Sequence, residues 1–323
     1  MTLSAETTRQ QAVQIQAAVT VLNSGGLIGL PTETVYGLGA DATNARAVAT
    51  IYEAKGRPRF NPLISHIANL DSAQREGVFS PLAMRLALAF WPGPLTLVVP
   101  RRDTTSVCEL ACAGLSTVAL RVPAHTLTLS LLSAFGRPVA APSANVSGQP
   151  SPTTADHVRS EMGNKIGLVL DGGPCGIGLE SAVVAVSGDN ATLLRLGGLA
   201  REDIEAITGP LLSPSTSDLS APASPGMILR HYAPKAPVIL NHVTAGESDV
   251  LIGFGQIEDN PVFNLSRDGD LHHAAANLFA FLRAADAMNP RQIRIAPIPD
   301  VGLGEAINDR LRRAAEGQKS GKG

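Results

Sequence analysis

Residues 209–226 divide this chain into two parts and thereby limit what it can fold into. Gly, Pro, Ser and Thr dominate this stretch. Such a composition is typical of a linker that its prolines make semi-stiff. A chain of 323 residues is long enough for two domains. We therefore expect one domain over residues 1–208, a connecting segment over 209–235 and a second domain over 236–323.

Short helices and strands are mixed before the linker without a strict βαβ rhythm. Apolar periodicity predicts helices over residues 8–24, 46–54, 81–91 and 126–135. Short apolar runs predict strands over residues 27–30, 63–67, 95–99, 117–122, 139–141, 168–170, 182–186 and 191–196. This pattern predicts an α/β or α+β domain with a twisted mixed sheet.

The part beyond the linker predicts a small α/β domain. Its expected strands cover residues 238–240, 250–254 and 293–296, and its expected helices cover residues 271–287 and 304–315.

Composition argues against several classes of protein. Formal charge is −2 and aromatic residues make up 4%. A chain that mainly holds nucleic acid is usually basic, and an RNA platform needs aromatic side chains for stacking. Three cysteines without Cys-x-x-Cys spacing argue against a disulfide framework or a zinc site. We find no leader pattern and no apolar run long enough to span a bilayer. We therefore expect a cytoplasmic protein without metal ligands.

Residues 55–66 concentrate positive charge. Lys55, Arg57 and Arg59 fall within five residues, separated by a glycine and a proline. A surface patch does not need that stiffness, whereas a site that holds several phosphate oxygens does. Lysine supplies a point charge and arginine a rigid fork of donors. The segment indicates a polyphosphate clamp.

Polar segments follow several of the predicted strands. Residues 31–39 form either a ligand loop or a polar turn. Ser143 and Asn145 alternate, so in extended backbone both point to one face and can bind phosphate, unless they form an Asx or Ser/Thr turn. Arg121 closes a strand and either holds a carboxylate or forms a surface ion pair. The glycine-rich loop 171–181 fits neither a Walker A nor a Rossmann fingerprint.

The end of the linker has an unusual composition. Residues 224–234 place Met, His and Tyr among prolines. Such a segment packs back onto the protein, either as a hydrophobic strap or as a lid over an active site.

Together these segments resemble the Sua5/YrdC family of threonylcarbamoyl-AMP synthases, in the long two-domain Sua5 form. The family's Lys-x-Arg plus Ser-x-Asn signature appears as Lys55/Arg57 and Ser143/Asn145. The other matching blocks are residues 31–39, 61–63, 91–96, 151–155 and 178–181. The resemblance covers about residues 10–235, and residues 231–237 resemble the junction to the family's C-terminal Sua5 domain.

The resemblance implies an activity and a fold. The family joins L-threonine, bicarbonate or CO2, and ATP into threonylcarbamoyl-adenylate and pyrophosphate, which is a nucleotidyltransferase reaction. The product feeds the N6-threonylcarbamoyl modification of adenosine 37 in tRNA through the tRNA threonylcarbamoyl transferase machinery. Mg2+ is expected on the triphosphate, and direct RNA binding is expected to be weak or absent. The implied fold is a YrdC-like catalytic domain around a large basic cavity, followed by a strap and a small α/β domain.

The chemistry agrees with these residues. The amine of threonine captures CO2, and the resulting carbamate attacks the α-phosphate of ATP in line. No protein nucleophile is needed, so catalysis would depend on positioning and charge neutralisation. By resemblance, Lys55 and Arg57 are the catalytic cations. The expected nucleotide ligands are Arg57, Asn61, Thr117, Ser143, Asn145, Ser151, Arg195 and Tyr232. The expected threonine ligands are Thr34, His66, Arg121, the backbone of Ala141, and Ser181.

Two alternatives compete with this interpretation. A basic concave surface could instead belong to a double-stranded RNA-binding or ribosome-maturation module, which a steep salt dependence of RNA binding would reveal. Hydrogenase maturation proteins carry the same domain for carbamoyl-adenylate chemistry, but this chain lacks their length and cysteines.

Overall fold

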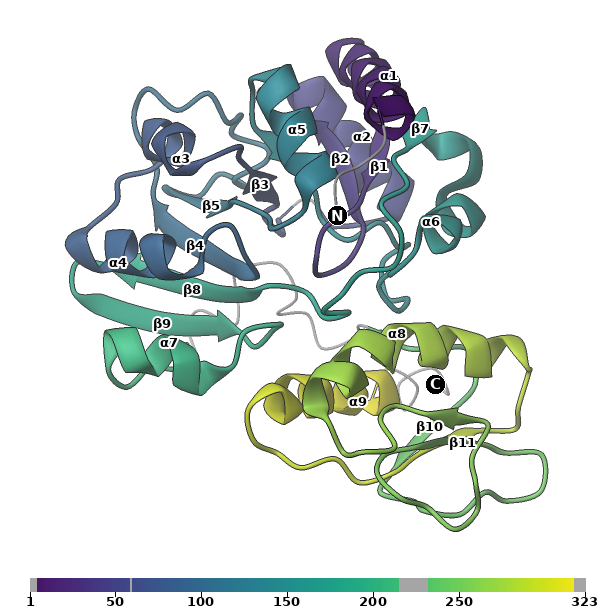
Figure 1. The fold of residues 1–323 in the computed structure, drawn as a ribbon. Coiled ribbons are helices and arrows are strands. Elements are labelled where there is room, and N and C mark those ends of the chain that lie inside the picture. The colour runs from purple at the N-terminus through teal and green to yellow at the C-terminus, as the bar shows by residue number, and fades with distance from the viewer. Residues whose placement is uncertain (1–4, 59, 215–231, 317–323) are drawn as a thin grey trace.

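The protein is described by a computed structural model that covers residues 5–58, 60–214 and 232–316 (Figure 1). Arg59 of the cationic segment and most of the expected strap therefore lie outside the described residues. The proposed domain limits at residues 208 and 236 stay predictions. Among the described residues, no helix is both long and apolar enough to cross a membrane.

The larger part is built on a nine-stranded mixed sheet in the order β7-β1-β2-β6-β3-β5-β4-β8-β9. Its strands are β1 (Ile28–Leu30), β2 (Gly37–Asp41), β3 (Ile64–His66), β4 (Leu95–Pro100), β5 (Thr117–Arg121), β6 (Val139–Ala140), β7 (Leu168–Val169), β8 (Ala182–Ser187) and β9 (Asn190–Arg195). The pairs β3–β5 and β4–β8 are parallel, whereas β4–β5 and β8–β9 are antiparallel. The expected mixed sheet is confirmed.

Helices cover this sheet, and their ends have clear local causes. They are α1 (Ala5–Asn23), α2 (Ala45–Lys55), α3 (Leu70–Glu76), α4 (Pro81–Phe90), α5 (Thr126–Phe135), α6 (Ala155–Met162) and α7 (Arg201–Thr208). Asn44 caps the start of α2, where its side chain accepts from the backbone of Arg46 and Ala47. Gly56 ends α2 in the left-handed region at φ 61°. This C-cap fixes Lys55 at the last position of the helix.

The second part has a four-stranded parallel sheet in the order β10-β13-β11-β12. Its elements are β10 (Val238–Leu240), β11 (Val250–Gly253), β12 (Phe263–Asn264), α8 (Leu271–Ala287), β13 (Ile293–Ile295) and α9 (Leu303–Glu316). Helices α8 and α9 lie on the side of this sheet that faces the larger part (Figure 1). The expected small α/β unit is therefore present.

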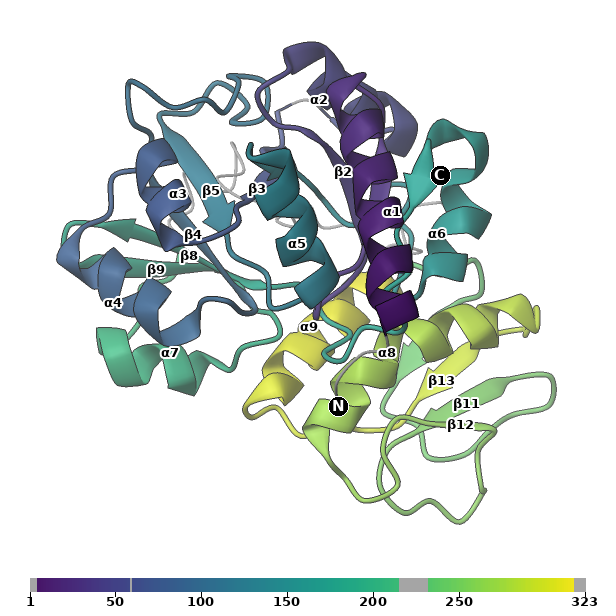
Figure 2. The same cartoon turned by 45° about the horizontal axis from the view of Figure 1, so that its top comes forward.

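The larger part lies against α8 and α9 of the second part (Figure 2). Val35 and Leu179 of the larger part belong to the apolar core that these two helices build. Gly178 has φ +75°, and a Cβ there would lie 2.4 Å from the carbonyl oxygen of Ala275 in α8. The backbones therefore approach too closely at this point for any side chain.

Some elements differ from the sequence prediction. The segment 31–39 was expected to stay irregular, but β2 begins at Gly37 and pairs antiparallel with β1. Glycine is favoured in this strand because a Cβ at Gly39 would lie only 2.8 Å from Cδ2 of Leu30. Helices α3, α6 and α7 were not predicted. They are short and polar, so they lack a long apolar repeat.

Candidate functional site

One small cavity collects most of the predicted site residues. Its lining residues are Thr32, Thr34, Val35, Gly37, Arg57, Ile64, His66, Arg121, Ala141, Pro142, Ser143, Glu180, Ser181, Arg195 and Tyr232. They come from the β1–β2 loop and the start of β2, from the segment after α2, from β3 and β5, from the segments after β6 and before β8, from the end of β9, and from the segment before β10. Its free volume is about 40 Å³. Substrate-sized ligands need pockets of roughly 300–1,000 Å³, so binding must widen this one.

All five residues predicted to bind threonine line this cavity, namely Thr34, His66, Arg121, Ala141 and Ser181. The register explains part of this grouping, because His66 in β3 lies directly beside Arg121 in β5. Ser181 precedes β8, and its hydroxyl lies 2.7 Å from that of Thr96 in β4. Segments far apart in the sequence thus meet where the mixed sheet brings them together.

Arg121 is held firmly inside the protein. Its side chain is 4% exposed and forms an ion pair with Glu33 at 2.6 Å, so the ion pair of the second interpretation is present but buried. The Nε group donates to the carbonyl of Gly93 at 3.1 Å, and Nη2 donates to Oε1 of Glu33 at 2.6 Å. The other carboxylate oxygen of Glu33 accepts from the backbone of Ala124 at 3.0 Å. Sequence reasoning missed Glu33 as a site residue. Its place within the polar segment 31–39 was the signal that could have indicated it.

The residues predicted to bind nucleotide divide into two sets. Arg57, Ser143, Arg195 and Tyr232 line the cavity. The remaining four do not line it; they are Asn61, Thr117, Asn145 and Ser151. Asn61, Asn145 and Ser151 are nevertheless buried, and Ser151 contacts the cavity through Glu180. The nucleotide roles of these residues stay predictions.

Lys55 lies behind the cavity. Its ammonium donates to the carbonyl of Ser143 at 2.5 Å and to the carbonyl of Asn145. Burial and then the nearby charge of Arg57 lower the pKa of Lys55 to about 7. The Lys55 amine thus hydrogen-bonds the backbone of the Ser-x-Asn segment, which connects the Lys-x-Arg and Ser-x-Asn halves of the family signature.

The side chains of Ser143 and Asn145 do not share one environment. Ser143 lines the cavity. The amide of Asn145 donates to the carbonyl oxygens of Val146 and Gln149, at 2.8 and 2.9 Å. Oδ1 of Asn145 has no partner within the described part of the chain, so these bonds are not those of the Asx turn that was the alternative.

Glu180 is the carboxylate of the cavity lining, and sequence reasoning did not single it out. Its Oε1 accepts from the Ser151 hydroxyl at 2.5 Å, and its Oε2 accepts from Nε of Arg310 at 3.1 Å. Burial raises the pKa of Glu180, but the charges of Arg310 and Arg195 outweigh burial and lower it to about 2. Glu180 is therefore ionised at neutral pH. Its place in the glycine-rich loop 171–181 was the available signal.

The cavity is basic, as expected, but it is not the large cavity that the resemblance implied, because the protein fills all but about 40 Å³ of it. Among its described lining residues, three arginines, Arg57, Arg121 and Arg195, accompany the single carboxylate of Glu180. Burial and then repulsion from Arg121 lower the pKa of His66 to about 3, so this imidazole is neutral. An excess of buried positive charge is expensive unless an anion binds there.

Several buried polar atoms of the predicted site residues have no partner. Among the described residues these include Nε of Arg57, Oδ1 of Asn61, Nδ1 of His66 and Oδ1 of Asn145. Buried polar atoms in folded proteins are normally hydrogen-bonded. The unpaired atoms therefore indicate a place where a polar ligand completes the structure.

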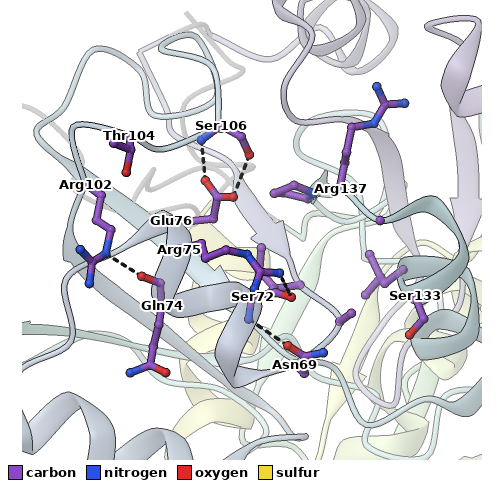
Figure 3. Close-up of a pocket in the computed structure, with 15 residues that line it drawn as sticks. Asn69, Ser72, Gln74, Arg75, Glu76, Arg102, Thr104, Ser106, Ser133 and Arg137 are labelled. Atoms are coloured by element: carbon purple, nitrogen blue, oxygen red, sulfur yellow. Dashed lines mark hydrogen bonds between the residues drawn. The ribbon is translucent and has the colours of Figure 1, made fainter.

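A larger cavity of about 880 Å³ lies elsewhere, between α3, the loop after β4 and the end of α5 (Figure 3). None of the predicted site residues lines it. Its carboxylate, Glu76, accepts from the backbone and hydroxyl of Ser106, and Arg102 donates to the carbonyl of Gln74 (Figure 3). Its lining also holds three arginines, Arg75, Arg102 and Arg137, so the two cavities differ in which predicted residues line them rather than in charge.

Glycine at position 197 is required next to this site. A Cβ there would lie 2.3 Å from the carbonyl carbon of Ser181 and 2.3 Å from the nitrogen of Ala182. Gly197→Ala should therefore destabilise the fold by about 1–3 kcal/mol, because rigid backbone must move. Gly176→Ala is the matched control, since no heavy atom lies within 4 Å of its added Cβ. Thermal unfolding of both variants tests this, and equal melting temperatures would contradict it.

The twisted mixed sheet and its buried cluster of arginines are typical of one class of protein. This class consists of α/β proteins that bind a small polyanionic substrate. The family model for Sua5, YciO and YrdC proteins, described as "Telomere recombination", matches residues 20–197. The model described as "Threonylcarbamoyl-AMP synthase, C-terminal domain" matches residues 199–316. The chain belongs to the Sua5/YrdC family, in the form that carries the Sua5 C-terminal domain.

Curated relatives and solved structures agree with this assignment. The chain is 42% identical over 327 residues to threonylcarbamoyl-AMP synthase of Bacillus subtilis, with 94% of each protein covered. It is 40% identical to the protein of that name from Pyrococcus abyssi, again over 94% of both. The crystal structure of P. abyssi Sua5 complexed with L-threonine has a TM-score of 0.86 and 39% identity, and the match covers 94% of both chains.

Proposed function

We propose that this protein is an L-threonylcarbamoyladenylate synthase, which converts L-threonine, bicarbonate or CO2, and ATP into threonylcarbamoyl-AMP and pyrophosphate. The observation that carries the proposal is the gathering of all five predicted threonine ligands in one basic cavity with Arg57 and Arg195. P. abyssi Sua5, which is similar to this chain over 94% of both chains, has a crystal structure as a complex with L-threonine.

Arg121 is the anchor for the carboxylate of threonine. Its guanidinium uses Nε and Nη2 for Gly93 and Glu33, and its remaining N–H groups can donate to a second carboxylate. Glu33 keeps the fork oriented. The neutral imidazole of His66 and the hydroxyls of Thr34 and Ser181 surround this point and can hydrogen-bond the amine and hydroxyl of the substrate.

The triphosphate is bound by the other two arginines of the cavity, Arg57 and Arg195. Arg57 donates to the carbonyl of Pro62 at 3.2 Å, and its Nε lacks a partner. Arg57 and Arg195 neutralise the phosphates, while Lys55 holds the Ser143 segment and adds charge behind it. Ser143, Asn145, Ser151, Asn61, Thr117 and Tyr232 are the further nucleotide ligands that we propose.

The reaction needs no protein nucleophile. The carbamate formed from threonine attacks the α-phosphate, and pyrophosphate leaves in line. The protein contributes by aligning the two substrates and by neutralising charge that builds up on the phosphate oxygens. Burial strengthens both effects, because the arginines act where little water competes.

Mg2+ would enter this site bound to the triphosphate. Among the described residues, no group of three or more His, Cys, Asp or Glu side chains could hold a metal ion. The carboxylate of Glu180 is already engaged by Ser151 and Arg310. When bound to the nucleotide, Mg2+ would neutralise phosphate charge together with Arg57 and Arg195.

The cellular context completes the proposal. The product would pass to the tRNA threonylcarbamoyl transferase machinery, and the enzyme would act in the cytoplasm. No feature of the described cavity favours binding of double-stranded RNA over binding of a small polyanionic substrate.

ATP binding should take up a proton at pH 8. Lys55 has a pKa of about 7 in the free protein, so it is largely neutral there. A bound triphosphate favours the ammonium form and raises this pKa. Because the complex then holds more protons than the free protein, ATP affinity should rise as pH falls from 9 toward 7. Titration calorimetry in buffers of different ionisation enthalpy measures the uptake, and equal apparent enthalpies would contradict it.

The deciding experiment for the function is pyrophosphate release from ATP by purified protein, in bicarbonate buffer with Mg2+, with and without L-threonine. Release that depends on both threonine and bicarbonate supports the proposal. Bound ATP without any release would reject threonine as the acceptor and direct the search to another amine.

A further inference from the structure

Arg310 extends from the second part of the protein to the wall of the cavity. It lies in α9 and is fully buried at 0% exposure. Its Nε donates to Glu180 Oε2 at 3.1 Å, and its Nη2 donates to the carbonyl of Leu196 at 2.7 Å. Its Nη1 pairs with Asp309 of the same helix at 2.8 Å. One guanidinium thus connects α9 to two separate segments of the larger part.

The two contact points are next to predicted ligands. Glu180 directly precedes Ser181, and Leu196 directly follows Arg195. Arg195 in turn donates to the carbonyl of Ser181 from Nε at 3.1 Å and from Nη2 at 2.8 Å. Arg310 therefore holds together the start of β8 and the end of β9, where Ser181 and Arg195 face the cavity.

The same guanidinium supports Tyr232. The carbon at its centre lies 5.3 Å from the centroid of the Tyr232 ring. On α8, Phe279 stacks on that ring at a centroid distance of 5.3 Å and an interplanar angle of 26°. Tyr232 has φ +68°, a conformation that persists only where surrounding contacts hold it. The second part of the protein thereby fixes a residue that lines the cavity.

We propose that Arg310 is a positioning residue of the adenylation site, through which the C-terminal domain holds Glu180, Arg195 and Tyr232 in the arrangement that binds ATP. This inference rests on the proposed function and assigns a task to the C-terminal domain. Arg310 acts through these residues.

A purely structural role would not require this pattern. A buried ion pair contributes little net stability compared with well-packed apolar side chains of similar volume. Here the guanidinium instead donates to Glu180 and to the carbonyl of Leu196, which lie on segments that carry predicted ligands. Glu180 in turn accepts a hydrogen bond from Ser151. The predicted threonine anchors His66 and Arg121 lie in β3 and β5, outside this set of contacts, whereas the threonine ligand Ser181 lies within it.

The test compares Arg310→Met, which keeps the bulk of the side chain and removes its donors, with wild-type protein. We expect the KM for ATP to rise at least tenfold and kcat to fall, while the KM for threonine rises by a smaller factor, because Ser181 lies beside the clamped segments but His66 and Arg121 do not. Arg201→Met is the matched control, because Arg201 also crosses between the two parts, pairing with Glu305 at 2.9 Å near the surface. Its kinetic constants should stay within twofold of wild type.

Other outcomes decide against the inference. A folded Arg310→Met protein with a lower melting temperature but an unchanged KM for ATP would show a structural role only. If that variant does not fold, Glu180→Gln provides the same test, since it weakens the Arg310 contact from the other side; an unchanged KM for ATP would again reject the inference. The proposed function is tested independently of this inference: it is wrong if wild-type protein shows no threonine-dependent release of pyrophosphate. The affinity for ATP itself, measured by calorimetry, then still distinguishes Arg310→Met from wild type.

Discussion

Replacing Arg121 by alanine is expected to raise the KM for threonine about 100-fold and to leave the KM for ATP within a few-fold of wild type. The guanidinium is buried, and it is fixed by Gly93 and Glu33 beside the position that we assign to the threonine carboxylate. Charge-assisted hydrogen bonds contribute roughly 1.5–3 kcal/mol each, and 1.4 kcal/mol corresponds to a factor of about ten. Loss of a forked contact therefore gives an effect of about this size. Steady-state pyrophosphate release with each substrate varied in turn measures both constants.

Arg159→Ala is the control for that prediction. Arg159 is also an arginine in an ion pair, with Asp156 at 2.7 Å, but its side chain is 47% exposed. Such surface pairs contribute little, so its kinetics should match wild type. Equal threonine constants for Arg121→Ala and wild type would remove Arg121 from the substrate site. Equal losses for ATP and threonine would show that the substitution merely unfolds the cavity.

Local patterns in the sequence were sufficient for much of the fold. The helix α5 begins and ends at the predicted residues, because its apolar repeat stops at Gly136, which adopts the left-handed conformation. Helices α3 and α6 were missed because capping by Asn69 and Thr154 defines their first turns more than any apolar repeat does. Nonlocal pairing in the mixed sheet had no local signature at all.

The candidate site shows the same division. The segments that carry the cavity residues were recognisable, because unusual polar groups follow buried strands. The side chains that pair with these cavity residues were not recognisable from the sequence. Glu33 and Arg121 are 88 residues apart, and Glu180 and Arg310 are 130 residues apart. Which carboxylate orients which arginine depends on how strands and domains pack, and single-sequence patterns do not contain that information.

The second large effect is expected from Lys55→Met, which should lower kcat/KM for ATP about 100-fold and destabilise the protein by about 2 kcal/mol. The substitution leaves the carbonyl oxygens of Ser143 and Asn145 without their donor, and each unsatisfied buried group costs about 1–3 kcal/mol. Part of that loss is offset, because the variant no longer buries an ammonium group beside Arg57. The kinetic loss comes from two sources, since the Ser143 segment is released and positive charge near the triphosphate disappears.

Lys165→Met separates these effects from the general consequence of removing a lysine. Lys165 also donates to a backbone carbonyl, that of Ala54 at 3.0 Å, but it is exposed. Its stability, kinetics and proton uptake should therefore equal those of wild type. Thermal unfolding, kinetics and calorimetry at pH 8 give the comparison. If Lys55→Met loses stability but keeps both its kcat/KM for ATP and the proton uptake of wild type, Lys55 only supports the backbone, and the charge of the clamp must come from the arginines. If it loses all three, the buried amine connects the Lys-x-Arg and Ser-x-Asn segments and also serves the nucleotide.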